Sequence, residues 1–193
     1  QLAGHSFGAK VALELAIQLQ RQGDEVAVLV VMGAPAPSAQ ITPQGKDWDD
    51  CQCLVELAKA IGGFLGKDLN VHHDTLLALE PDQRLSCFRD CLVAANWLIP
   101  QTPLVQIRGL VDVFAANVSA EYLPKMPDKI AKLVLLKGKD EPKHWDIQDD
   151  PNWGWQNYAT TVFEHDIPGD HSSVFYPPQV AGLVAVLQRY MRA

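Results

Sequence analysis

The residues best suited to chemistry lie near the start of the chain, in the run Gly4-His5-Ser6-Phe7-Gly8. This run fits the pattern Gly-x-Ser-x-Gly, in which a serine occupies a sharp turn between a strand and a helix. The turn is tight, so we expect a side chain at either glycine to collide with the packed strand or helix. The pattern predicts Ser6 as a nucleophile and the Phe7 backbone amide as a donor to the oxyanion.

A serine nucleophile needs a general base, and six histidines are available. His171 lies in the loop "PGDHSSVF" before the last helix, where the base falls in the chain order Ser, acid, His. A lone loop histidine is usually only solvated, but this position favours His171 as the base. His5 is adjacent to Ser6, and its side chain would point away at such a turn, so we expect a structural role for it. The remaining histidines are His72, His73, His144 and His165.

The acid that orients the histidine can come from the end of either of two strands. The first strand ends in "MGAP" (residues 32–35), which holds no carboxylate, and the second ends in "LLKGKDEP", which offers Asp140 and then Glu141. A carboxylate directly after a buried strand is suited to reach a neighbouring loop, so Asp140 is the predicted acid. The alternative is a solvated turn, because Lys-Asp-Glu-Pro is also ordinary turn sequence. The weaker candidates are Asp149, Asp150 and Asp170, of which Asp170 is expected to shape the histidine loop.

The elements around these residues are typical of an α/β protein with a mostly parallel sheet. Apolar residues at helical spacing follow Gly8 and end at Gly23, where a glycine suits a helix C-terminus. Buried strands are predicted at 25–32 and 129–137, with a further strand in "TTVFEHDIP". The amphipathic segment "QVAGLVAVLQRYM" predicts a final helix. Helix, tight turn and strands together predict an α/β-hydrolase.

About ninety residues separate the two buried strands, too many for an unstructured loop. Three helical patterns fill this interval, with Asp47 and Thr102 as predicted N-caps of the first and third. We expect a helical lid inserted at 38–125 within a single domain 1–193; the alternative is ordinary packing helices. Because each βαβ unit takes roughly 30 residues, we also expect several N-terminal strands, with half of the oxyanion hole, to be absent from this chain.

Composition excludes some classes of partner. The formal net charge is −7 and the isoelectric point about 5.2, which argues against nucleic acid. No apolar run reaches the length of a membrane span, and no signal peptide opens the chain, so a cytoplasmic protein is expected. The spacing of the cysteines matches no usual zinc pattern, so free thiols without a metal are predicted. These cysteines are Cys51, Cys53, Cys87 and Cys91.

Several segments resemble the thioesterase domains of nonribosomal peptide and polyketide synthetases. They are "LAGHSFGAKVALELAIQLQRQG", "VFAANVSAEYLP", "NWGWQNYA" and "IPGDHSSVFYPPQVAGLVAVL", spread over nearly the whole chain. The resemblance implies an α/β-hydrolase with a helical lid. It also implies that an acyl or peptidyl chain passes from the phosphopantetheine thioester of a carrier protein to Ser6, and leaves by hydrolysis or cyclisation. No cofactor of the domain's own is implied.

One departure from that family bears on mechanism. The family commonly places its catalytic Asp just after the strand that follows the elbow, and here that position is Gly33. Either the acid lies at Asp140 or the domain is impaired. Two alternatives to a chain-releasing thioesterase therefore stay open. One is a free-standing editing thioesterase or general esterase, and the other is a non-catalytic module that docks a carrier protein.

Overall fold

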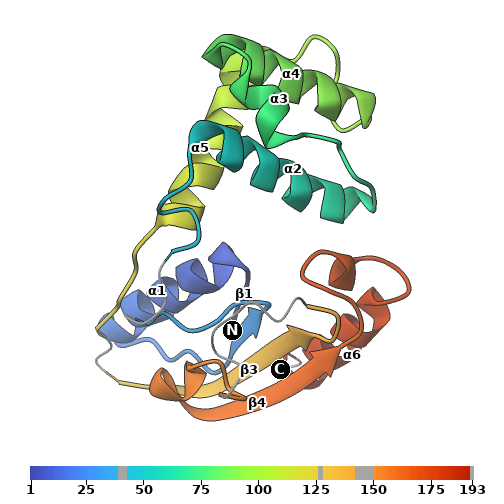
Figure 1. Cartoon of the computed structure of the whole chain (residues 1–193). Helices are drawn as coiled ribbons and strands as arrows, with labels where there is room; N and C mark the ends of the chain where they lie inside the picture. Colours follow the sequence, from blue (N-terminus) through green and yellow to red (C-terminus); the bar gives the residue numbers. More distant parts are fainter. Residues whose placement is uncertain (39–42, 126–127, 142–149, 192–193) are drawn as a thin grey trace. The chain divides into compact units, whose positions relative to one another are not determined.

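The computed structural model describes residues 1–38, 43–125, 128–141 and 150–191. The chain forms two compact units: Gln1–Ile41 with Tyr122–Ala193, and Thr42–Glu121 (Figure 1). The first unit holds the sheet, and the second is built from helices alone in the part that the structure describes. No described helix is long and apolar enough to cross a membrane.

The first unit is organised around a four-stranded sheet in the order β1-β2-β3-β4, and every pairing is parallel. The mostly parallel sheet predicted from the sequence is thereby confirmed. β2 is shorter than predicted: the strand was expected over residues 25–32, and residues 25–28 lie before its start. The strands are β1 (Leu2–His5), β2 (Leu29–Met32), β3 (Ile130–Gly138) and β4 (Ala159–Ile167).

Helices cover both faces of this sheet, which explains why β2 and β3 are apolar without alternation. Leu29 and Val31 pack in one core with α1 (Phe7–Arg21), whereas Val30 packs in the opposite core with α6 (Val180–Tyr190). Successive residues of a strand point to opposite faces, so both sets must be apolar. Two short 3₁₀ helices complete the unit: η1 (Trp155–Asn157) before β4 and η2 (Ser173–Phe175) before α6.

The carboxyl ends of the strands are tied to one another beyond the strands themselves. The Ser6 amide donates to the Met32 carbonyl at 3.0 Å, and the Gly33 amide donates to the Leu136 carbonyl at 2.9 Å. Further along, the Asp140 amide donates to the Gly169 carbonyl at 3.1 Å. Because all four strands are parallel, the loops that carry the candidate site residues meet at this one edge of the sheet.

The helical unit has a core of its own. Phe88, Leu92 and Ile107 are at most 1% exposed and belong to one cluster with other apolar side chains of the same unit. The short helix α3 was not predicted from the sequence. Whether the unit acts as a lid stays a prediction. Its helices are α2 (Asp50–Leu65), α3 (His73–Leu77), α4 (Pro81–Ala94) and α5 (Leu104–Ser119).

Two of the predicted helix caps are displaced. The N-cap of α2 is Asp49, whose carboxylate accepts from the Gln52 amide at 2.7 Å, and not Asp47. The N-cap of α5 is Pro103, whereas the hydroxyl of the buried Thr102 donates to a carbonyl of the preceding turn. Both displacements are small, because neighbouring residues of a cap can exchange roles without altering the helix.

Candidate active site

Ser6 occupies the turn between β1 and α1 with φ 53° and ψ −126°. Residues other than glycine seldom adopt positive φ, and such strain concentrates at functional sites. A Cβ atom on Gly4 would fall against the Gly8 carbonyl, as predicted. The same expectation for Gly8 is wrong for the described residues, because a Cβ atom there meets nothing within 4 Å.

His171 lies in the loop between β4 and η2, and Asp170 holds that loop in shape. One Asp170 oxygen accepts from the Ser172 amide at 3.0 Å and from the Ser173 amide and hydroxyl at 2.8 Å each. Burial would raise the pKa of Asp170, but the hydrogen bonds from Ser173 and Ser172 and the nearby His171 lower it overall. The predicted shaping role of Asp170 agrees with these contacts.

His5 links the nucleophile turn to the histidine loop. Its Nε2–H donates to the His171 carbonyl at 2.9 Å, and the two rings lie 4.4 Å apart. Phe175 meets the His5 ring edge-on, with centroids at 4.7 Å. Burial, and then the neighbouring His171, lower the pKa of His5 to about 4. His5 is therefore neutral at physiological pH and holds the backbone of His171 beside the chain that carries Ser6.

Among the described residues, the carboxylate that forms an ion pair with His171 belongs to Glu141. Its Oε1 lies 3.7 Å from His171 Nδ1, longer than a hydrogen bond, and the Glu141 side chain is only 7% exposed. Gly33 adjoins both groups: a Cβ atom there would lie 2.9 Å from Glu141 Oε1 and 2.9 Å from His171 Nδ1. The sequence showed Glu141 only as the neighbour of the preferred Asp140, with no signal of its burial.

Two of the other candidate acids accept from backbone amides. Asp140 is exposed, and its carboxylate accepts from the Gly169 amide at 3.2 Å. Asp150 accepts from the Asn152 and Gly154 amides at 3.0 and 2.9 Å, in the turn before η1. Asp149 and His144 lie outside the described residues.

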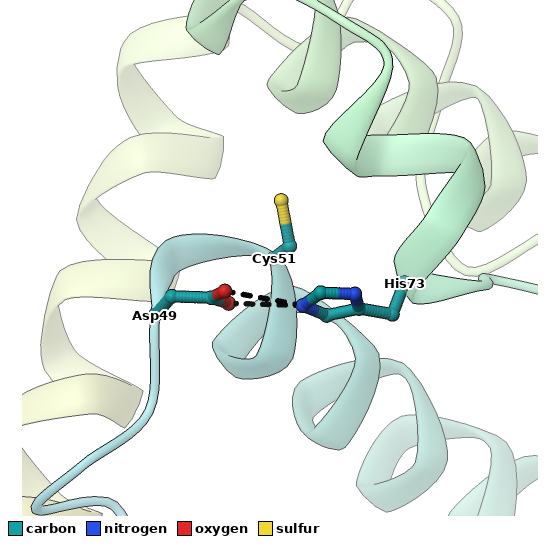
Figure 2. A group of neighbouring side chains, drawn as sticks. All are labelled: Asp49, Cys51 and His73. Atoms are coloured by element: carbon teal, nitrogen blue, oxygen red, sulfur yellow. Dashed lines mark hydrogen bonds and ion pairs between the residues drawn. The ribbon is translucent and has the colours of Figure 1, made fainter.

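Two further described histidines, His165 and His73, have side-chain partners of their own. His165, on β4, contacts the Tyr190 hydroxyl at 2.9 Å. In the helical unit, His73 binds the Asp49 carboxylate through Nε2 at 3.1 and 3.3 Å, which joins α3 to the start of α2. The Cys51 sulfur lies within 4.8 Å of the ligand atoms of this pair, and the dashed contacts in Figure 2 join only Asp49 and His73. Burial raises the pKa of the Cys51 thiol, and all four cysteines are free.

The fold and this edge of the sheet define a class of protein. A parallel sheet covered on both faces by helices, with a strained serine at a strand-to-helix turn, is the architecture of an α/β-hydrolase. The Thioesterase domain family model matches residues 1–192, and the chain belongs to this family. Proteins similar to it include synthetases, one of them a nonribosomal peptide synthetase, and separate thioesterase domains.

The relatives are far longer than this chain. Chondramide synthase cmdD of Chondromyces crocatus is 26% identical over 97% of the chain, which spans 5% of that protein. Aspulvinone E synthetase melA of Aspergillus terreus is also 26% identical over 97% of the chain, which spans 20% of it. The chain thus corresponds to a small part of each.

Solved structures show the same fold. The four-domain nonribosomal peptide synthetase AB3403, in its holo form bound to AMP and glycine, matches 97% of this chain with a TM-score of 0.84 and 29% identity. The match covers 14% of the synthetase chain. The Vlm2 thioesterase domain matches 97% of this chain and 67% of its own, with a TM-score of 0.62 and 22% identity.

Proposed function

We propose that this chain is a serine thioesterase that releases an acyl or peptidyl chain from the phosphopantetheine thioester of a carrier protein. The observation that supports this best is the strained backbone of Ser6 at the sheet edge where the His171 loop is anchored. Membership of the thioesterase family, and similarity to synthetases that include a nonribosomal peptide synthetase, support the substrate class.

Each group has a defined part in the proposed reaction. His171 accepts the Ser6 proton at Nε2 while the Ser6 oxygen forms a bond to the thioester carbonyl carbon. When the tetrahedral intermediate collapses, the carbon–sulfur bond breaks, and His171 returns the proton to the departing thiolate. Water or a nucleophile of the bound chain then attacks the acyl–Ser6 ester by the same proton transfers. No metal or cofactor takes part in these steps.

The developing oxyanion needs donors that are already in place. Phe7 is the first residue of α1, and the first amides of a helix have no partner within the helix. The Phe7 amide is therefore the proposed donor, as the sequence predicted. The positive end of the α1 dipole adds to the same stabilisation.

A catalytically impaired module that only docks a carrier protein is the main rival. It predicts that Ser6 is no more reactive than an ordinary serine. An editing thioesterase would share the whole mechanism and differ only in the substrate that it receives.

Reaction with an alkyl fluorophosphonate separates the proposed enzyme from the catalytically impaired module. The full-length protein that carries this chain should be labelled rapidly, with the adduct mapped to Ser6 by mass spectrometry, and Ser6→Ala should not be labelled. Acyl- and peptidyl-pantetheine thioesters should then be turned over by the wild type only. A wild type that neither labels nor turns over either thioester would exclude the proposal. The product, a free acid or a cyclic molecule lacking one water, identifies the second acceptor.

A further inference from the structure

We propose that Glu141 is the positioning residue for His171, supplied from the end of β3, and that Gly33 at the end of β2 is the space this carboxylate requires. The proposal rests on Ser6 and His171 acting as nucleophile and base. Glu141 thus takes the part that the sequence assigned to Asp140. The room that its carboxylate needs is a structural reason for the glycine at position 33.

The burial of Glu141 is the first observation. Its side chain is 7% exposed, and its Oε2 is buried with no hydrogen-bond partner among the described residues. A buried carboxylate is costly unless a cationic group or several donors face it. His171 is the ion-pair partner that the described residues provide, at 3.7 Å, and neutral His5 packs against the same ring. A carboxylate in this environment is suited to stabilise a charge that forms on His171 during the reaction.

The shape of the β3 exit explains how Glu141 reaches this place. The Glu141 amide donates to the Gly138 carbonyl at 3.4 Å, which closes a turn at the end of β3. Adjacent residues of this turn face different ways: Asp140 binds the Gly169 amide on the β4 side, whereas Glu141 faces Gly33 on the β2 side. Asp140 is therefore engaged with backbone, and the side chain one residue later meets the imidazole.

Gly33 provides the complementary observation. Its φ of 56° lies in the left-handed region, and a Cβ atom would come within 2.9 Å of both Glu141 Oε1 and His171 Nδ1. Those distances are too short for carbon beside oxygen or nitrogen, so a side chain at position 33 would displace the carboxylate or the ring. The buried carboxylate at the end of β3 therefore requires a glycine at the end of β2.

The proposed role needs no proton transfer to Glu141. Its carboxylate favours the His171 tautomer with hydrogen on Nδ1, which leaves Nε2 free to accept the Ser6 proton. It then stabilises the imidazolium that results. Asp170 instead shapes its own loop, where one of its oxygens accepts from Ser172 and Ser173.

The test compares Glu141→Gln with the matched control Asp140→Asn in the full-length protein. For turnover of an acyl-pantetheine thioester and for fluorophosphonate labelling, Glu141→Gln should lose roughly 10²- to 10⁴-fold, by analogy with removal of a triad acid. Asp140→Asn should stay within about 10-fold. The loss should fall on kcat. The acidic limb of the pH profile should move to lower pH, because the neutral glutamine amide does not stabilise the imidazolium as the carboxylate does.

Moving the carboxylate from position 141 to position 33 tests whether Glu141 positions His171 or only stabilises the fold. Glu141→Ala empties the space beside Gly33, into which the His171 ring can move away from a Cβ atom at position 33. Gly33→Asp would then place a carboxylate near His171 from the end of β2. Aspartate tolerates positive φ better than most residues. Gly33→Asp alone should impair the enzyme, and adding it to Glu141→Ala should restore activity at least 10-fold over Glu141→Ala.

The outcomes distinguish the two proposals. A wild type that labels, with Glu141→Gln labelled at the same rate, overturns the role of Glu141 and leaves the serine mechanism standing. So does a double variant no better than Glu141→Ala, even if Glu141→Gln fails to fold. A wild type that does not label at all overturns both.

Discussion

At the scale of single residues, the sequence alone did not reveal the contact between His5 and His171. A histidine beside the nucleophile was expected to point away and to be structural, and it does have a structural contact. That contact is with the carbonyl of His171 itself, and the ring lies against His171 and Phe175. The geometry of the histidine loop therefore depends on a ring that stays neutral.

We expect this ring to make folding stability depend on pH. The pKa of His5 is lowered from 6.5 to about 4 in the folded chain, so the unfolded chain binds a proton that the folded one does not. The stability that neutral His5 contributes is complete above pH 6.5 and is lost as the pH falls toward 4. The groups that face His5 are His171 and the Glu141 carboxylate.

Urea unfolding of the wild type and of His5→Gln at pH 7.5 and pH 5 measures this effect. The glutamine can still donate a hydrogen bond but does not titrate. The wild type should lose more free energy of unfolding between the two pH values than the variant does. Equal losses would show that His5 titrates normally in the folded protein.

At the scale of elements, the β1–α1 turn depends on close contact between its two ends. Gly4 lies where a Cβ atom would meet the Gly8 carbonyl and the Ala9 backbone, whereas Gly8 faces open space among the described residues. The two glycines of one motif are thus expected to differ in cost when replaced.

Alanine at each position tests this difference. Gly4→Ala must displace α1 from β1, so it should destabilise the protein by about 1–3 kcal/mol or more, as overpacking does. Gly8→Ala, in the first turn of a helix, is the matched control and should cost clearly less. The free energy of unfolding in urea gives the ranking, and a Gly8→Ala cost equal to that of Gly4→Ala would contradict it.

At the scale of the whole molecule, the two units have separate cores. Phe88 lies in the core of the helical unit, and Leu133 lies in the core between the sheet and α1. Since the clusters share no residue, we expect a defect in one core to leave the other largely intact.

Amide hydrogen exchange on Phe88→Ala tests this independence. Loss of a buried phenylalanine costs about 3–5 kcal/mol, and exchange should accelerate in α2, α4 and α5 while β2 and β3 stay protected. Leu133→Ala should give the opposite pattern. Uniform acceleration throughout the chain in both variants would show a single cooperative unit.

The sequence by itself determined the elements and the order of the chemical groups along the chain. The apolar runs of β2 and β3 predicted buried parallel strands, and Gly-x-Ser-x-Gly before a helical pattern predicted the turn at Ser6. These features are local: a period of two or of 3.6, or a steric demand for glycine, is present in the residues themselves. The same local information placed His171 in the loop after the last strand.

The tertiary structure alone decided which carboxylate meets His171. Asp140 and Glu141 are neighbours in one turn. The Asp140 carboxylate binds the Gly169 amide, whereas the Glu141 carboxylate lies beside Gly33. Sequence patterns locate the end of a strand only to within a few residues, which is insufficient to assign the direction of either side chain. The close approach of Glu141 and His171 beside Gly33 exists only once the ends of β2, β3 and β4 lie side by side.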